Sequence, residues 1–374
     1  MNAREAYIAL NMMEEIGPVG VRALVSKLGS PQAIFTADRE KLIEAEGIGR
    51  AAVEKIIEQR HAVRPDEELQ RAAGLGAEII TPADSGYPKD LARIHDPPLA
   101  LYVLGKLLPN DRHAIGVVGS RHTTFYGRET AESMAYQLVH AGFTVVSGLA
   151  RGIDTAAHKG ALKAKGRTLA VLGGGLDCIY PPENKQLAAE ISKSGAVLSE
   201  FPIGRKPDKT TFPIRNRIIS GLSMGVVVVE AGLASGALIT ANQALDQGRC
   251  VFAVPGRIDS PSSRGTHLLI KNGARLVESV DDILQEFEFL IPRPNPAKPA
   301  SADTISLPPL DKDEETVVQC LGDGEKNADE IIRATGIGAS RLGSILLGLE
   351  MKRAVRLQPG RMIHLIRKTA PRER

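Results

Sequence analysis

The chain has 374 residues, a formal net charge of +3, 43% hydrophobic residues and 24% charged residues. This length exceeds one ordinary domain, and the composition is that of a globular protein with a sizeable core. No apolar run is long enough to span a bilayer, and the acidic start of the chain lacks the pattern of a secretory signal. The three cysteines, Cys178, Cys250 and Cys320, have neither disulfide nor metal-ligand spacing, so we expect free thiols, no metal and a cytoplasmic location.

Residues 1–63 form a small helical segment in which one motif occurs twice. Gly17-Pro18-Val19-Gly20 and Gly47-Ile48-Gly49 each precede a helical pattern, as in a SAM-like helix-hairpin-helix pair. Such turns present backbone amides that can face a phosphate. Acidic residues slightly outnumber basic ones here, so two interpretations stay open: DNA contact, and structural packing or protein contact.

Residues 64–290 alternate short apolar runs with longer amphipathic ones. The predicted strands are Ala114–Gly119, Thr144–Ser147, Thr168–Leu172, Ala196–Ser199, Gly225–Glu230 and Cys250–Val254. The predicted helices are Tyr126–His140, Ile153–Lys165, Glu183–Ser192, Ala237–Gln247 and Gly265–Lys271. Unalternating apolar strands separated by helices are typical of a parallel sheet buried on both faces. The fold class is therefore α/β, with a Rossmann-like, doubly wound and mostly parallel sheet.

Residues 291–309 are rich in proline and form a predicted extended linker. Residues 310–374 follow as a compact module. The apolar spacing predicts three helices, Glu314–Leu321, Ala328–Thr335 and Ala339–Lys352, and a hairpin of Ala354–Leu357 with Met362–Leu365. Three helices followed by a hairpin form a winged-helix pattern, which binds DNA in some proteins and other proteins in others.

Basic and glycine-rich turns follow the predicted strands. Ligands of doubly wound sheets bind at the carboxyl ends of the strands, so these turns are expected to share one basic rim. The cations of this rim are Arg121, Arg151, Arg205, Lys206, Lys209, Arg215, Arg217 and Arg257. A structural role remains open for each residue, because glycines form turns and Arg215 and Arg217 can pair with Asp154 or Glu230.

Enzyme signatures are missing from the chain. It contains no P-loop, no complete G-x-G-x-x-G fingerprint, no H-E-x-x-H and no G-x-S-x-G. Asp154 and His158 are four residues apart on one predicted helix, where a helix-stabilising contact is favoured over catalysis.

Taken in chain order, the strand-end motifs resemble those of the DNA-processing protein A (Smf) family. They run from Gly116-Val117-Val118-Gly119-Ser120-Arg121 and Ser147-Gly148-Leu149-Ala150-Arg151-Gly152 to Phe212-Pro213-Ile214-Arg215-Asn216-Arg217 and Ser235-Gly236-Ala237. The series also includes Gly173-Gly174-Gly175 and Tyr180-Pro181-Pro182-Glu183-Asn184, and it closes with Val254-Pro255-Gly256 and Gly265-Thr266-His267-Leu268-Leu269-Ile270.

The resemblance implies a protein that binds single-stranded DNA and loads the RecA recombinase onto it during DNA uptake, natural transformation and recombination. It implies a homodimer formed through the Rossmann-like domain, without enzyme activity, cofactor or membrane contact. The family's basic residues fall on Arg121, Lys185 and Lys209, and its aromatic contact falls on Phe212. The full predicted site comprises Gly119, Ser120, Arg121, Ser147, Gly148, Arg151, Lys185, Lys209, Phe212, Arg215, Asn216, Arg217, Ser235 and Gly236.

Two other functions are alternatives to this one. A nucleotide or nucleoside-phosphate hydrolase would use Glu230 as its acid, but it would carry a P-G-G-x-G-T loop where this chain has Pro255-Gly256-Arg257. A transcriptional regulator would bind duplex DNA through the winged helix, for which the tail lacks a strong basic bias.

Overall fold

The computed structural model describes residues 1–287, 310–322, 326–351, 354–357 and 362–365. It divides into two compact units, Met1–Leu290 and Ile291–Arg374. The predicted linker, residues 291–309, lies outside the described residues. Within the described part of the chain, no helix combines the length and apolar character needed to cross a membrane.

The first unit begins with a cluster of short helices that has its own apolar core. These are α1 (Ala3–Met12), α2 (Pro18–Leu28), η1 (Gln32–Phe35), α3 (Arg39–Ile43) and α4 (Arg50–Gln59). The two repeated motifs lie where α2 and α4 begin, and Gly20 of the first lies against the Ile48 side chain of the second. Leu24, Leu42 and Ile56 are fully buried between these helices, which confirms the predicted helix-hairpin-helix arrangement.

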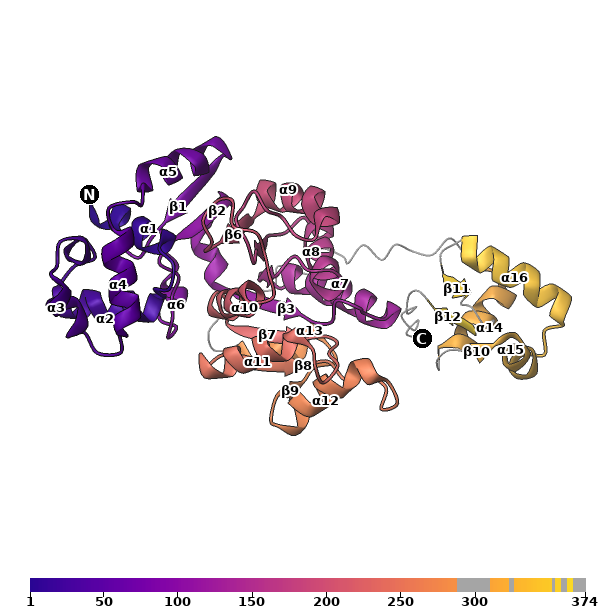
Figure 1. Ribbon diagram of the computed structural model, residues 1–374. Coiled ribbons are helices and arrows are strands. Elements are labelled where there is room, and N and C mark those ends of the chain that lie inside the picture. Colours follow the sequence, from indigo (N-terminus) through magenta and orange to yellow (C-terminus); the bar gives the residue numbers. More distant parts are fainter. Residues whose placement is uncertain (288–309, 323–325, 352–353, 358–361, 366–374) are drawn as a thin grey trace. The chain divides into compact units, whose positions relative to one another are not determined.

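A nine-stranded sheet follows, in the order β1-β2-β6-β5-β4-β3-β7-β8-β9 (Figure 1). The six predicted strands are all present as β3 (Ala114–Val118), β4 (Thr144–Ser147), β5 (Thr168–Val171), β6 (Ala196–Ser199), β7 (Gly225–Val228) and β8 (Cys250–Ala253). They pair in parallel, and the order reverses at β3, which lies between β4 and β7. The mostly parallel doubly wound sheet is therefore confirmed, and its switch point places a ligand crevice beyond the end of β3.

The sheet is longer at both edges than the sequence predicted. β1 (Ala77–Ile80) and β2 (Leu101–Gly105) add an antiparallel pair beside β6, and β9 (Arg275–Leu276) adds a short strand beside β8. α5 (Pro65–Gly74), α6 (Lys89–Ala92), η2 (Pro109–Arg112) and α13 (Val280–Phe287) were likewise not predicted. Apart from β9, whose two residues are exposed, each of these elements contains at least one buried residue.

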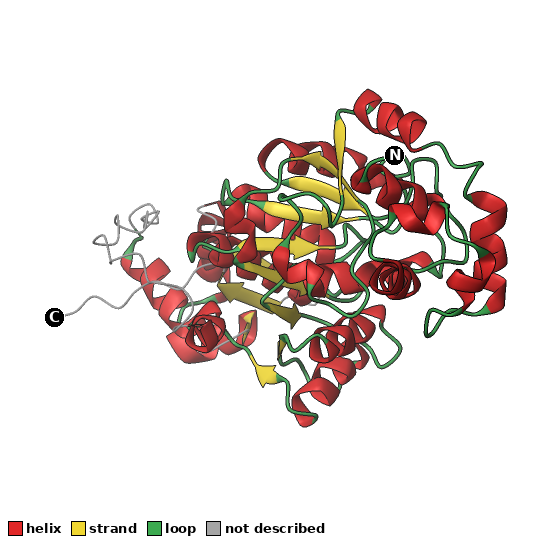
Figure 2. Ribbon diagram, turned by 90° about the vertical axis from the view of Figure 1, so that its left-hand side faces the viewer, coloured by secondary structure: helices red, strands yellow, loops and turns green. Residues whose placement is uncertain are grey.

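Helices surround the strands of this unit (Figure 2). One face packs against α10 (Thr211–Gly221), α11 (Gly236–Asp246) and α12 (Arg264–Lys271), through residues such as Ile218 and Ala241. On the other face, α8 (Ile153–Lys163) contacts β3, β4 and β5, while α9 (Lys185–Ser194), preceded by η3 (Pro182–Asn184), contacts β5 and β6. α7 (Phe125–His140) packs directly against α8, and η4 (Pro261–Ser263) precedes α12.

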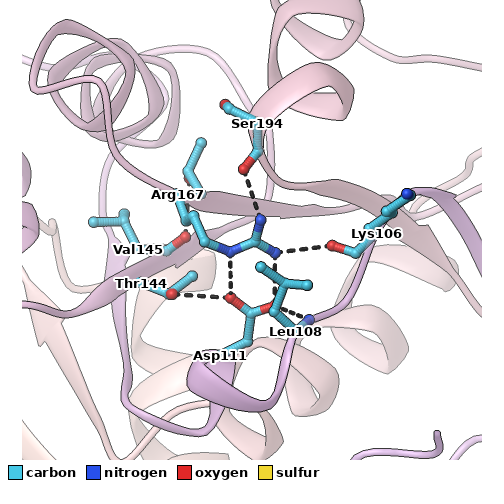
Figure 3. A network of polar contacts seen from close by, with 8 residues as sticks. Lys106, Leu108, Asp111, Thr144, Val145, Arg167 and Ser194 are labelled. Atoms are coloured by element: carbon cyan, nitrogen blue, oxygen red, sulfur yellow. Dashed lines mark hydrogen bonds and ion pairs between the residues drawn. The ribbon is translucent and has the colours of Figure 1, made fainter.

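A polar network around Arg167 and Asp111 joins four segments of this unit (Figure 3). The Arg167 Nε and Nη2 atoms each donate to one Asp111 carboxylate oxygen, both at 2.8 Å. The same guanidinium donates to the carbonyls of Ser194 and Lys106, and Thr144 donates to Asp111. A planar guanidinium can satisfy four acceptors at once, so Arg167 joins the start of β5 and the end of α9 to the loop after β2. Asp111 adds the start of β4 through Thr144.

The second unit is a winged helix, as predicted. Its elements are α14 (Lys312–Leu321), β10 (Lys326–Asn327), α15 (Ala328–Thr335), α16 (Ala339–Met351), β11 (Val355–Leu357) and β12 (Met362–Leu365). The strands form an antiparallel sheet in the order β10-β12-β11. Arg341 on α16 forms an ion pair with Asp313. Six further cations of this module lie outside the described residues: Lys352, Arg353, Arg367, Lys368, Arg372 and Arg374.

Candidate nucleic-acid interface

An open pocket of about 530 Å³ lies beyond the carboxyl end of β3. Four segments line it: the turn after β3, the region from the loop after β4 to the start of α8, the start of α10 with the loop before it, and the start of α11 with the loop before it. This strand-end pocket brings together nine of the predicted site residues, namely Gly119, Ser120, Arg121, Lys209, Phe212, Arg215, Asn216, Ser235 and Gly236. Its position is the one at which doubly wound sheets bind ligands.

The turn after β3 is held rigidly and presents Arg121 to solvent. The Ser120 amide donates to the Glu230 carbonyl at 2.7 Å, and a Cβ on Gly119 would lie 2.6 Å from Ile153. Only glycine fits this close approach. Arg121 is exposed and forms no ion pair among the described residues, and its guanidinium carbon lies 4.6 Å from the centre of the Phe212 ring. A cation over a ring is a weakly held arrangement that a nucleic acid can replace.

Beside the pocket, two neighbouring rings lie between two cations. The Tyr180 and Phe212 ring centres are 6.0 Å apart, and the Arg151 guanidinium lies 5.6 Å from the Tyr180 ring centre. Arg121, Phe212, Tyr180 and Arg151 thus form a row that lines a small adjoining hollow, and Arg121 and Phe212 also line the pocket itself. Arg151 is bound to Glu183, and this hydrogen bond lowers the pKa of the Glu183 carboxyl.

Tyr180 was not among the predicted site residues. The available signal in the sequence was an aromatic residue directly before Pro181-Pro182, in the loop that follows β5. Proteins that bind single-stranded nucleic acids use aromatic rings to stack bases and nearby cations to contact phosphates.

The floor of the pocket carries a buried positive charge. Arg215 is 4% exposed and donates to the carbonyls of Gly148 and Val171, and its Nε donates to Asn216 at 3.1 Å. Burial lowers the pKa of Arg215 to about 10, Arg121 adds to this lowering and Asp154 opposes it. At neutral pH Arg215 therefore remains protonated, and its charge faces a pocket that contains one carboxylate, Asp154.

The beginning of α11 faces the same pocket, which Ser235, Gly236 and Ala237 help to line. The Ser235 Oγ caps the helix by accepting from the Ala237 amide at 3.3 Å. Amides at a helix N-terminus carry partial positive charge and favour an anion. Lys209 is exposed in the loop before α10, where Asp208 accepts from the amides of Thr210 and Thr211.

Not every predicted residue reaches this site. Gly148 and Arg151 line the adjoining hollow. Ser147 is fully buried and donates to the Val117 carbonyl at 2.6 Å, and Lys185 is exposed at the start of α9 without lining a described pocket. Arg205, Lys206 and Arg257, which were expected on the same rim, also line none of the described pockets.

Arg217 requires a correction, because its charge does not belong to the basic rim. It is 4% exposed and pairs with Glu200 and with Asp96, the latter at 3.0 Å. Arg215 and Arg217 lie two residues apart on α10, which is a rotation of about 200° around a helix. Two such side chains face opposite sides, so only Arg215 can face the pocket.

Glu230, the acid of the hydrolase alternative, is bound as an anchor. It is 4% exposed and accepts hydrogen bonds from Thr123, from the amide and hydroxyl of Thr124, and from Ser262. Burial acts to raise its pKa, but these hydrogen bonds outweigh it and lower the pKa below the ordinary value. A carboxylate held ionised by four donors is a poor general acid.

Asp154 and His158 likewise have separate structural partners. The Asp154 carboxylate accepts from the amides of Gly148 and Ala150, and His158 Nδ1 lies 2.7 Å from Thr168 Oγ1. In place of the predicted contact with each other, Asp154 contacts the loop after β4 and His158 contacts β5.

Acidification is expected to destabilise the protein through His158. Burial, and then the charge of Arg215, lower the pKa of this histidine from 6.5 to about 3. Because the folded state holds the imidazole neutral, His158 does not reduce the free energy of unfolding at a pH above 6.5, where the imidazole of the unfolded chain is neutral as well. As the pH falls below that value, the free energy of unfolding decreases by about 1.4 kcal/mol per unit until the pH nears the folded-state pKa. Urea unfolding between pH 7 and pH 4.5 measures this decrease, which His158→Gln should reduce; an unchanged pH dependence in the variant would contradict the assignment.

Comparison with known proteins adds an independent observation. Residues 78–288 match the family described as DNA recombination-mediator protein A, residues 296–361 match a DprA winged helix domain, and residues 7–61 match a SAM-like helix-hairpin-helix tandem. A protein Smf from Synechocystis sp. is 41% identical over 76% of this chain and 72% of its own length. The DNA processing protein DprA of Bacillus subtilis is 42% identical over 68% of this chain and 86% of its own length.

Solved structures show the same likeness. DNA processing protein A of Streptococcus pneumoniae superposes with a TM-score of 0.68 at 37% identity, covering 77% of this chain and 99% of that one. The DNA processing protein A of Helicobacter pylori, described for its single-stranded DNA binding mode, superposes with a TM-score of 0.52 at 29% identity. That superposition covers 57% of this chain and 96% of the Helicobacter chain.

Proposed function

Because the chain belongs to the DNA-processing protein A (Smf) family, we propose that it is a DNA-processing protein that binds single-stranded DNA in the strand-end pocket. The observation that carries this proposal is the row of Arg121, Phe212, Tyr180 and Arg151 at the edge of a pocket with a buried cation. The Helicobacter relative, whose described subject is single-stranded DNA binding, supports it.

The pocket assigns different tasks to its residues. Arg121 and Lys209, both exposed, contact phosphates, and Arg215 provides a fixed positive field from below. The first amides of α11 add donors for a phosphate oxygen. Phe212 supports a base, which takes the place of the Arg121 guanidinium on the ring or stacks against its other face. These contacts involve the backbone and base faces, so binding tolerates any sequence.

The protein acts without catalysing a reaction in this proposal. Glu230 is saturated by hydrogen bonds, and Asp154 and His158 are bound to neighbouring elements. The bound strand is presented to the RecA recombinase, a step that serves DNA uptake and recombination in the cytoplasm. A RecA strand-exchange assay on DNA coated with a single-strand-binding protein tests the loading step; no stimulation by this chain would refute it.

A homodimer formed through the α/β unit is part of the same proposal. Leu268 on α12 and Leu276 on β9 are 41% and 47% exposed, at the sheet edge where β9 offers unpaired backbone groups. Sedimentation of the full chain tests it, since a monomer at micromolar concentration would exclude a stable dimer.

The binding proposal is tested by fluorescence-anisotropy titration of labelled single-stranded and double-stranded oligonucleotides. Binding is expected to favour the single strand and to weaken steeply with salt. The slope of log affinity against log salt concentration should be about −0.7 for each phosphate contact. Duplex preference, or affinity that is insensitive to salt, would contradict a phosphate-binding pocket that stacks bases.

A further inference from the structure

A second hollow, of about 720 Å³, lies between α7 and α8, and its residues Arg128 and Lys159 are not among the predicted site residues. It shares Arg121 and His122 with the strand-end pocket, so the two are continuous across the turn after β3. Four cations line this α7–α8 groove together with two carboxylates: Arg121, Arg128, Arg151 and Lys159, with Glu132 and Glu183.

The two helices that flank the groove cross closely. A Cβ on Gly160 of α8 would lie 2.1 Å from the Glu132 carbonyl oxygen of α7, so only glycine permits this approach. Arg128 lies one helical turn before Glu132, and Lys159 is adjacent to Gly160. The crossing therefore places one exposed cation from each helix on the walls of the groove.

The two carboxylates of the groove are already neutralised. Glu132 accepts from Lys163 at 2.9 Å, and Glu183 is paired with Arg151. Within the described residues, the side chains of Arg128 and Lys159 have neither an ion-pair partner nor a hydrogen-bond partner. Both charges are thus available to a ligand, and the local balance is positive.

The position of Arg121 links the groove to the strand-end pocket. The Ile153 amide, at the start of α8, donates to the Ser120 carbonyl at 3.2 Å, which fixes the turn against α8. A strand whose phosphate is bound at Arg121 therefore meets α8 and its Lys159 next if it continues in this direction.

A third hollow on another side of α7 has the opposite character. It is lined by Glu129 and Glu278 among uncharged residues and contains no cation in its lining. A polyanion leaving the strand-end pocket is repelled there and attracted by the α7–α8 groove.

Resting on the proposed single-strand binding, we propose that the α7–α8 groove is a second phosphate-binding track. It receives the backbone of the strand as it leaves the strand-end pocket, with Arg128 and Lys159 as the contacting residues. The occupant is the continuation of the same single strand, because the groove is continuous with the pocket and has matching charge. Affinity then depends on oligonucleotide length beyond what the strand-end pocket alone can hold.

The test compares the double variant Arg128→Ala/Lys159→Ala with the unaltered full chain on labelled oligothymidylates of about 6 and about 20 nucleotides, sizes that bracket common site lengths. For the long oligomer, loss of two phosphate contacts should reduce the slope of log affinity against log salt concentration by about 1.4. Near 0.1 M salt this corresponds to an affinity about 25-fold lower. The short oligomer should bind both proteins equally. The matched control is Lys89→Ala/Lys193→Ala, which removes two exposed cations that line none of the described pockets.

The outcomes separate this inference from the proposed function. If the unaltered chain binds the short oligomer and the double variant retains full affinity for the long one, the second track is wrong and the strand-end pocket stands. An equal loss on both oligomers, or the same loss in the control variant, also overturns the track. If the unaltered chain binds neither oligomer, the proposed function itself fails.

Discussion

Replacing Arg121 by alanine is expected to weaken single-stranded DNA binding by about 30-fold, equivalent to about 2 kcal/mol for a lost charge-assisted contact. Arg121 lines the strand-end pocket, its small adjoining hollow and the α7–α8 groove, so every path of the strand passes it. The salt slope should also fall by about 0.7, since one phosphate contact is removed. Anisotropy titrations at several salt concentrations measure both quantities.

Phe212→Leu provides the contrasting variant. It removes the ring, whose stacking contributes about 1–3 kcal/mol per base, but it leaves every cation in place. Affinity should fall while the salt slope stays unchanged. Lys89→Ala is the control for charge, because Lys89 is exposed and lines none of the described pockets. If Arg121→Ala behaves like Lys89→Ala, the strand-end pocket is not the DNA site.

Replacing Arg217 by methionine is expected to destabilise the α/β unit by about 4 kcal/mol, because it leaves the Glu200 carboxylate buried without its partner. The side chains of Arg217 and Glu200 are 5% and 8% exposed. Burial raises the pKa of the Glu200 carboxyl, and the Arg217 charge opposes that rise. Chemical unfolding of the full chain, followed by circular dichroism, measures the loss.

The double variant Arg217→Met/Glu200→Leu isolates the cause. Glu200 Oε1 and Arg217 Nη1 have no hydrogen-bond partner among the described residues, so the pair itself is incompletely satisfied. Removing both charges should therefore recover most of the stability lost in the single variant. If the double variant is as unstable as Arg217→Met, packing rather than the uncompensated charge determines the effect. DNA binding by the double variant should match the unaltered chain, since Arg217 lines none of the described pockets.

The local pattern of the chain determined the parallel core. Thr144–Ser147 and Ala196–Ser199 were predicted residue for residue, because a strand buried on both faces must be a short, continuous apolar run between glycine-rich turns. The same logic located the functional turns. Gly119-Ser120-Arg121 and Ser235-Gly236 both follow strands, and parallel strands necessarily end at one edge of the sheet.

Tertiary structure alone decided which charges face the ligand. The sequence does not distinguish Arg215 from Arg217, because α10 was not predicted as a helix. On that helix the two side chains point in opposite directions, Arg215 toward the pocket and Arg217 toward Glu200. Tyr180 joins the site only because the loop after β5 brings its ring to within 6.0 Å of the Phe212 ring centre.

The α7–α8 groove depends in the same way on contact between distant residues. Neither Arg128 nor Lys159 carries a local signal, and the crossing at Gly160 is what places both on one hollow. Sequence periodicity specifies elements and the edge at which they end, because both follow from local burial. The direction and pairing of each side chain depend on packing between segments that are far apart in the chain.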